Sequence, residues 1–230
     1  AGQTTYEDLY ADPLLWMNKG WLDYIAPQAY WSMDYPAAGH RIITEWWSQT
    51  LPQSNIYMGN GTYKIKNNKD EAWKKNQEIP NQIVNARQDG NINGNIFFSA
   101  KSLIGKHKKV NRILRKVYAT PSKNPMPSKP LERDLTALQL GEVKSYKEKL
   151  SYCINHQDSI PRFVLLYALK GNEKAGANKT LLEKNYLSPN ETERCFDQTI
   201  PKGYRKFNLG VSVRDAYGNE SPIQLLNPTL

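Results

Sequence analysis

Polar and aromatic side chains recur at the ends of three apolar segments in the first half of the chain. The segments cover residues 21–31, 55–63 and 94–99, and a helical pattern follows each. Strands that alternate with helices form parallel sheets, in which functional residues gather at the carboxyl ends. The candidate site residues at these ends are Gln28, Tyr30, Trp31, Asn60, Tyr63 and Ser99.

This set of side chains suits recognition of a neutral saccharide. Flat aromatic faces stack on sugar rings, and amides form hydrogen bonds with sugar hydroxyl groups. The alternative is that Tyr30 and Trp31 only cover the rim of the fold. Gly59 and Gly61 flank Asn60 and also leave two interpretations open, an anion-binding nest or the more common short turn that needs positive φ.

Acids suited to cleaving a glycosidic bond are missing from these strand ends. Glycoside hydrolysis generally needs two carboxyl groups that flank the bond, and Asp34 is the one acid close to a predicted tip. A loop Asp is more often a turn former than a catalyst. Glu78 lies on a predicted helix, where we expect it to cap a nearby loop or pair with a cation. The chain alone is therefore predicted to be inactive as a hydrolase.

Metal and cofactor chemistry is not indicated. The histidines, His40, His107 and His156, are scattered, and no Cys or carboxylate stands at metal-ligand spacing from them. We predict no metal site and no cofactor.

Four helices are predicted to position the strands, over residues 4–20, 38–51, 70–88 and 102–118. The first opens on a capping-box pattern at residues 4–7 and stops at Gly20, with Pro13 restarting or bending it. The third offers Trp73, Ile79, Ile83 and Val84 to the core.

The formal net charge of +9 has a local source. Residues 101–118 carry seven cations and no acid, which suits a nucleic-acid surface or the solvated outer face of a helix. We favour the second interpretation and expect no nucleic-acid partner. The side chains expected to pack inward are Leu103, Ile104, Val110, Ile113, Leu114 and Val117. No apolar run is long enough for a membrane span, and no signal peptide is recognisable.

The composition changes after residue 118. All six tryptophans lie in the first 73 residues, whereas prolines at 121, 125, 127 and 130 predict a stiff linker over residues 119–130. Apolar residues then alternate with period two over residues 150–154, 163–169 and 207–213, which predicts a β-sandwich. Cys153 and Cys195 either pair in an exported protein or remain two buried thiols.

Several of these segments together resemble the bacterial glycosyl-hydrolase-like family 10. The matching stretches are residues 5–12 (TYEDLYAD), 23–31 (DYIAPQAYW), 46–47 (WW), 57–65 (YMGNGTYKI) and 94–99 (GNIFFS). The resemblance implies that residues 1–118 are the last three strand-helix units of a (β/α)8 barrel, with about three parallel strands and four helices. It also implies a carbohydrate substrate, catalytic acids upstream of Ala1, and a secreted or envelope-associated parent protein, periplasmic or a lipoprotein.

Residues 131–230 resemble the fibronectin type III domain that commonly follows this barrel. Residues 215–222 (DAYGNESP) are similar to the turn between the last two strands of such domains, and Tyr152 stands where they usually place a core tryptophan. The leading hypothesis is therefore a fragment of a glycoside hydrolase that contributes part of the substrate cleft. The alternative is a non-catalytic module that binds a glycan or a protein. Because an open parallel sheet exposes its edges, we expect self-association.

Overall fold

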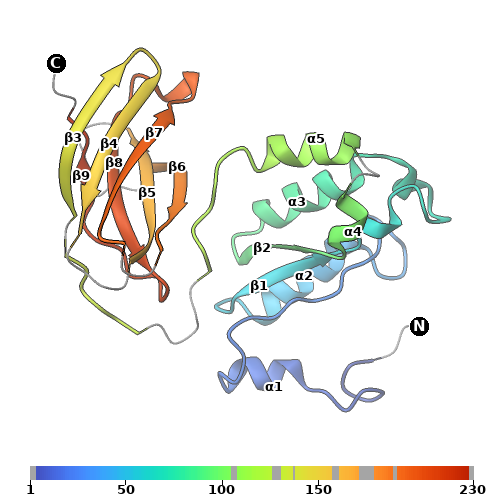
Figure 1. Cartoon of the computed structure of the whole chain (residues 1–230). Coiled ribbons are helices and arrows are strands. Elements are labelled where there is room, and N and C mark those ends of the chain that lie inside the picture. Colours follow the sequence, from blue (N-terminus) through green and yellow to red (C-terminus); the bar gives the residue numbers. More distant parts are fainter. Residues whose placement is uncertain are drawn as a thin grey trace. The chain divides into compact units, whose positions relative to one another are not determined.

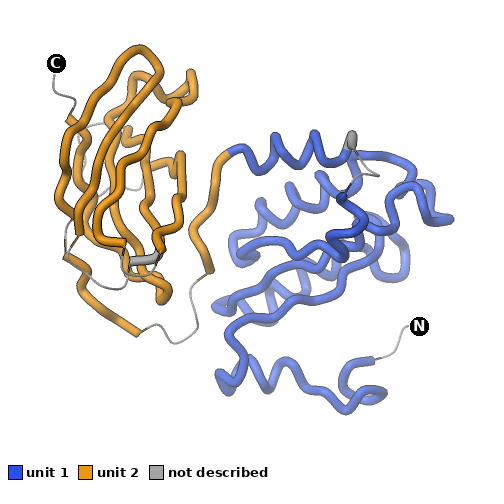
Figure 2. The backbone as a smooth tube through the Cα atoms, in the orientation of Figure 1, with its two compact units in different colours: residues 1–119 blue, residues 120–230 orange. Residues whose placement is uncertain are grey.

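The chain folds as two compact units, Ala1–Ala119 (unit 1) and Thr120–Leu230 (unit 2), shown in Figure 2. The computed structural model describes residues 4–104, 108–125, 131–136, 138–156, 161–170, 179–188 and 191–227. Lys106 and His107 of the basic segment, and Pro127 and Pro130 of the predicted linker, lie outside the described residues.

Unit 1 is built on a parallel sheet of two strands, β1 (Ile56–Asn60) and β2 (Ile92–Phe97) (Figure 1). Residues 25–28 flank the other edge of β1 and pair with it at two isolated parallel bridges, Ile25 with Ile56 and Gln28 with Gly59. Pro27, which has no N–H to donate, stands between these bridges. The prediction of about three parallel strands is therefore wrong for the first of them, which is an extended segment with intermittent pairing.

Unit 1 has five described α-helices, where the sequence predicted four. Asp12 accepts a hydrogen bond from the Leu15 N–H at 2.8 Å, and Pro13 takes the first helical position, so the first helix is shorter than predicted. Gly20, at φ 65°, follows its end as predicted. The helices are α1 (Pro13–Asn18), α2 (His40–Thr50), α3 (Glu78–Gln88), α4 (Ala100–Leu103) and α5 (Lys108–Val117).

The predicted helix over residues 70–88 is two elements in the structure. Asp70 caps the 3₁₀ helix η2 (Glu71–Lys74) by accepting from the Ala72 N–H at 3.0 Å, and α3 begins only at Glu78. Pro80 lies in the first turn of α3, and in a continuous helix its ring would clash with the carbonyl four residues earlier. The basic segment is likewise divided between α4 and α5.

Two apolar clusters hold unit 1 together. Val110 of α5 is fully buried, Leu114 and Val117 pack beside it, and Arg112 and Arg115 are exposed, as expected for a helix with one solvated face. Ile104 and Val84 were predicted to be inside, but they are 75% and 47% exposed. The buried members are Ala29, Leu51, Ile56, Met58 and Ala86 in one cluster and Ile65, Trp73, Ile79, Ile83 and Val110 in the other.

Unit 2 is a β-sandwich of two antiparallel sheets. One sheet has the order β3 (Gln139–Tyr146), β4 (Lys149–Asn155), β7 (Glu193–Thr199). The other has the order β6 (Lys179–Tyr186), β5 (Pro161–Leu169), β8 (Asn208–Asp215), β9 (Gln224–Leu225). A 3₁₀ helix, η3 (Lys202–Tyr204), lies between β7 and β8.

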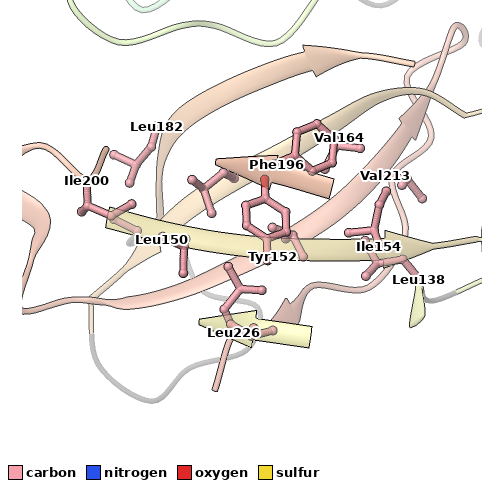
Figure 3. Packing of buried hydrophobic residues seen from close by; sticks show 14 of the residues in the cluster. Leu138, Leu150, Tyr152, Ile154, Val164, Leu182, Phe196, Ile200, Val213 and Leu226 are labelled. Carbon is pink, nitrogen blue, oxygen red and sulfur yellow. The ribbon is translucent and has the colours of Figure 1, made fainter. Parts of the chain in front are cut away.

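Both sheets contribute to the core between them (Figure 3). Tyr152 is 1% exposed and its ring stacks on Phe196 with centroids 5.1 Å apart. In β5 the alternating set Leu165, Tyr167 and Leu169 forms a second cluster on the other face, whereas Val164 and its alternates face the intersheet core. This strand is apolar on both faces, so its period-two pattern did not identify which face points inward.

Two local features fix the strands of unit 2. Cys153 and Cys195 are paired residues on β4 and β7, and a disulfide joins them. Asp215 organises the turn between β8 and β9, because its carboxylate accepts from the backbone N–H groups of Tyr217 and Asn219, both at 2.9 Å. Gly218 takes a positive φ of 98° in this turn.

The described part of the predicted linker is held against unit 2. Lys184 Nζ donates to the Ser122 carbonyl at 3.0 Å and to Asn124 Oδ1 at 2.7 Å. Arg214 Nη1 donates to the Asn124 carbonyl at 3.0 Å. Residues 122–124 therefore form part of the sandwich surface. Among the described residues, no helix combines the length and apolarity needed to cross a membrane.

Candidate functional site

Three aromatic rings meet at the carboxyl ends of the parallel segments in unit 1. Tyr30 follows the first segment, Tyr63 lies in the 3₁₀ helix η1 (Thr62–Lys64) after β1, and Phe98 follows β2. The ring centroids are 6.0 Å apart for Tyr30 and Tyr63, 5.9 Å for Tyr30 and Phe98, and 5.9 Å for Tyr63 and Phe98. Phe98 is 56% exposed and Tyr63 39%. We call these three side chains the aromatic platform.

The platform gathers two predicted site residues and one that the sequence reasoning missed. Tyr30 and Tyr63 were predicted; Phe98 was passed over in favour of Ser99, the next residue. The available signal was the pair of aromatic residues Phe97 and Phe98 at the end of β2, because successive residues of a strand point to opposite faces. Phe97 packs against the core of unit 1, and Phe98 is the exposed ring.

Gly59 and Gly61 leave room for neighbouring groups to lie close to the backbone next to the platform. A Cβ on Gly61 would lie 3.2 Å from Tyr30 Cβ and 3.4 Å from a Tyr63 ring carbon. A Cβ on Gly59 would lie 2.7 Å from the Pro27 carbonyl oxygen. Gly61 has φ −83°, so the predicted turn with positive φ is wrong. These glycines are needed for space, not for a left-handed backbone.

Asn60 lies in a buried polar network and does not reach the exposed face. Its Nδ2 group donates to His40 Nε2 at 3.1 Å and to Gln82 Oε1 at 2.9 Å, and the residue is fully buried. Gln82 Nε2 donates to Glu78 Oε1 at 2.9 Å and to the Trp31 carbonyl at 3.1 Å. Glu78 Oε1 also accepts from the Met33 N–H at 2.7 Å, so Glu78 caps a loop as predicted. The network fixes the loop that begins at Trp31.

The hydrogen bonds of this network require a neutral His40. Asn60 Nδ2 can only donate, so His40 Nε2 must accept and the ring proton is on Nδ1. Nδ1 then donates to Thr44 Oγ1 at 3.2 Å, while the Thr44 hydroxyl donates to the His40 carbonyl at 2.7 Å. Burial lowers the pKa of His40 from 6.5 to about 4.

Acidification is expected to destabilise unit 1 through His40. Between pH 6.5 and about 4 the unfolded chain takes up a proton that the folded chain cannot hold, so stability falls as the pH is lowered through this range. The full loss is up to about 3 kcal/mol, at about 1.4 kcal/mol per pKa unit. Tryptophan fluorescence reports unit 1 alone because all six tryptophans lie there. The urea midpoint should change less with pH in His40→Gln; an equal pH dependence in both proteins would contradict this role.

The remaining predicted site residues are Gln28, Trp31 and Ser99. Gln28 is exposed and its backbone pairs with Gly59. Trp31 is half-buried, and Lys64 Nζ lies 5.9 Å from its ring centroid and 6.0 Å from that of Tyr63. Ser99 is also half-buried, and its carbonyl accepts from Ser102 Oγ at 2.6 Å. Burial raises the pKa of the Tyr30 hydroxyl, and the nearby Tyr63 raises it further.

Three carboxylates line a pocket of about 380 Å³ near the loop after Trp31: Asp34, Asp70 and Glu78. Asp34 is exposed and forms an ion pair with Arg41 at 3.2 Å. Asp70 accepts from Ser32 Oγ at 2.5 Å in addition to capping η2. Both Asp70 and Glu78 thus hold loops in place. Within the described ranges no three His, Cys, Asp or Glu side chains are grouped so as to hold a metal ion.

Comparison with known proteins identifies relatives of this chain. Residues 1–75 match the family described as "Glycosyl hydrolase-like 10", which confirms the resemblance found in the sequence. The chain is 30% identical over 232 aligned residues to "Glycosyl hydrolase YngK" of Bacillus subtilis, covering 96% of this chain and 44% of that protein. It is 36% identical over 66 residues to "Glycosyl hydrolase DigH" of Escherichia coli, covering 28% of this chain and 15% of that protein. The chain thus spans less than half the length of these relatives.

Solved structures give only weak likenesses. A superoxide reductase from Ignicoccus hospitalis matches 42% of this chain with a TM-score of 0.28 at 10% identity. A beta-glucosidase from Listeria innocua matches 86% of this chain, and 34% of its own, with a TM-score of 0.23 at 9% identity. Neither score is high enough to bear on the fold or the function.

Proposed function

We propose, from the match of residues 1–75 to the glycosyl hydrolase-like 10 family, that this chain supplies part of the substrate cleft of a glycoside hydrolase acting on an oligo- or polysaccharide. The observation that carries the proposal is the aromatic platform, which presents exposed Tyr63 and Phe98 beside Tyr30. Adjacent aromatic rings at strand ends offer flat apolar faces for sugar rings. In this proposal the polar side chains of Gln28 and Ser99 and the indole of Trp31 contribute to the same surface, and buried Asn60 helps to hold the loop after Trp31 through Gln82.

We place unit 1 in the carboxyl-terminal part of a (β/α)8 barrel, over residues 1–118. The parallel order of residues 25–28, β1 and β2, with helices between them, supports this assignment. In such a barrel the carboxyl ends of the strands form the active-site face. Tyr30, Tyr63 and Phe98 all follow the strand-like segments at that end. The Tyr63 ring is nearly perpendicular to the rings of Tyr30 and Phe98, at 82° and 87°, so a sugar ring would stack on one face at a time and meet the neighbouring rings at its edge.

The catalytic acids are proposed to come from a part of the barrel outside this chain. Hydrolysis needs one carboxyl group to protonate the leaving oxygen and a second to attack or to activate water. Asp70 and Glu78 are instead engaged by backbone N–H groups and neighbouring side chains. The 230-residue chain should therefore release no reducing ends from oligosaccharide panels. Measurable turnover that depends on Glu78 would contradict this division of roles.

Substitutions on the platform test whether it binds glycans. Tyr63→Ala and Phe98→Ala should each weaken glycan affinity about tenfold, because each removes one stacking face, a loss of about 1.4 kcal/mol. Tyr146→Ala is the matched control, since Tyr146 is 71% exposed in unit 2. Binding is measured on a glycan array and then by titration of intrinsic fluorescence. Unchanged affinity in both platform variants would reject the platform as the binding surface.

A non-catalytic glycan- or protein-binding module is the second candidate. It is favoured by the same exposed rings, which need no catalytic acids to bind a partner. The two functions can be distinguished by joining the chain to the upstream part of a relative. A hydrolase fragment would then catalyse glycan cleavage, whereas a binding module would bind the glycan without cleaving it.

Unit 2 is proposed to be a fibronectin type III-like domain over residues 131–230, preceded by the linker at 119–130. The two antiparallel sheets, the core position of Tyr152 and the turn at Asp215 support this assignment. The Cys153–Cys195 disulfide supports an oxidising location, secreted or in the cell envelope.

Self-association is expected for the 230-residue chain. Among the described residues β2 pairs only with β1, which leaves its other edge available, and Ile96 and Phe98 at this edge are 41% and 56% exposed. Multi-angle light scattering should give about twice the monomer mass of 26.4 kDa. A monodisperse, folded monomer at high concentration would contradict this expectation.

A further inference from the structure

Lys64 holds its ammonium group among aromatic rings. Its Nζ lies 5.9 Å from the centroid of Trp31, 6.0 Å from that of Tyr63 and 6.0 Å from that of Trp73. Cation–π attraction at these distances positions the ammonium. Among the described residues, Lys64 Nζ forms no ion pair and no hydrogen bond with a protein group, and its contacts are with the aromatic rings. No protein acceptor in the described part of the chain therefore competes with a ligand for this ammonium.

The nearest acid does not neutralise Lys64 directly. Burial lowers the pKa of the Lys64 ammonium, and the negative charge of Asp70 only partly opposes this. The Asp70 oxygens are used elsewhere, one by Ser32 Oγ and the other by the Ala72 N–H. A partly desolvated cation without a close counter-ion gains more from pairing with an anion than a fully exposed lysine does.

Tyr63 connects this cation to the aromatic platform. Its ring belongs to the platform and also lies under Lys64 Nζ. A sugar ring in contact with Tyr63 would therefore lie close to the ammonium. The polar and aromatic residues at the strand ends alone indicate a neutral saccharide, and Lys64 adds a positive charge at its margin.

We infer that Lys64 selects acidic sugars, by pairing its ammonium with the carboxylate of a uronic-acid-type residue whose ring stacks on the aromatic platform. This inference rests on the proposed function, and it adds the substrate class. A compact ammonium that donates in several directions suits a single carboxylate. The charge-assisted hydrogen bond would form in a partly desolvated place, where such bonds are strongest.

The test compares four proteins on matched glycans. The proteins are the unaltered chain, Lys64→Met, Lys64→Arg and Lys69→Met. The last is the control, because Lys69 is an exposed lysine five residues away whose loss changes the net charge equally. The probes are a glycan array of uronic-acid oligosaccharides and their carboxyl-reduced neutral counterparts, followed by titration at two salt concentrations.

The unaltered chain should prefer the acidic form of each matched pair. Lys64→Met should weaken binding of the acidic form about tenfold and leave the neutral form unchanged, which removes the preference. Lys64→Arg should keep most of the preference, and Lys69→Met all of it. Tryptophan fluorescence with urea confirms that each variant is folded.

Three results would overturn the inference and leave the proposed function standing: a preference for the neutral form, an equal loss for both forms in Lys64→Met, or no loss in Lys64→Met when the platform variants lose binding. If no protein binds any glycan on the array, both the inference and the proposed function fail. If the platform variants lose glycan affinity while Lys64→Met keeps it, the cleft binds glycans without selecting acidic sugars.

Discussion

Gly59→Ala is expected to destabilise unit 1 by more than about 3 kcal/mol, at or beyond the upper end of the usual overpacking range. A Cβ at this position would lie 2.7 Å from the Pro27 carbonyl oxygen, which is a backbone atom and cannot move aside cheaply. The same oxygen accepts the Gly59 N–H at 2.8 Å, so relieving the clash breaks the pairing of residues 25–28 with β1. Tyr30 would then lose its position in the platform.

Urea unfolding followed by tryptophan fluorescence measures this effect, because it reports only unit 1. Gly90→Ala is the matched control: a Cβ at this position would have open space around it, so its midpoint should change little. A Gly59→Ala midpoint equal to that of the unaltered chain would show that residues 25–28 do not depend on this contact.

Loss of the Cys153–Cys195 disulfide should destabilise unit 2 by about 4 kcal/mol. The bond closes a loop with a sequence separation of 42 residues, and its main effect is to restrict the unfolded chain. The Cys153→Ala, Cys195→Ala double variant should show this loss in calorimetry or in the near-ultraviolet dichroism of the unit 2 tyrosines. The tryptophan transition of unit 1 is the internal control and should stay unchanged. A double variant with an unaltered unit 2 transition would contradict the role of the bond.

The sequence predicted which segments form the candidate site better than it predicted whether each side chain there is exposed or buried. Tyr30 and Tyr63 were placed correctly at strand ends, because strand, turn and helix patterns are local. Asn60 was assigned to the same face, but it is buried among His40 and Gln82. These partners come from α2 and α3, and local periodicity carries no information about which helix side chains meet a given strand.

The element boundaries that were wrong have local physical causes. Pro27 interrupts the ladder of the first segment, and Pro80 prevents one continuous helix over residues 70–88. Both prolines are visible in the sequence, and their missing N–H groups limit strand pairing and helix continuity in a way that apolar periodicity does not show. The two-sided burial of β5 is different, because a strand covered on both faces gives no alternation to read.

The apolar character of β5 on both faces has a consequence for handling the protein. Residues 164–169 (VLLYAL) are six consecutive buried apolar residues without a proline, glycine or charge, which is the composition of segments that stack into cross-β fibrils when exposed. Arg162 and Lys170 flank the stretch in the sequence, as charged gatekeepers do in natural strands. Refolding of unit 2 should therefore lose yield steeply with protein concentration, through intermolecular pairing of this strand before the sandwich closes around it.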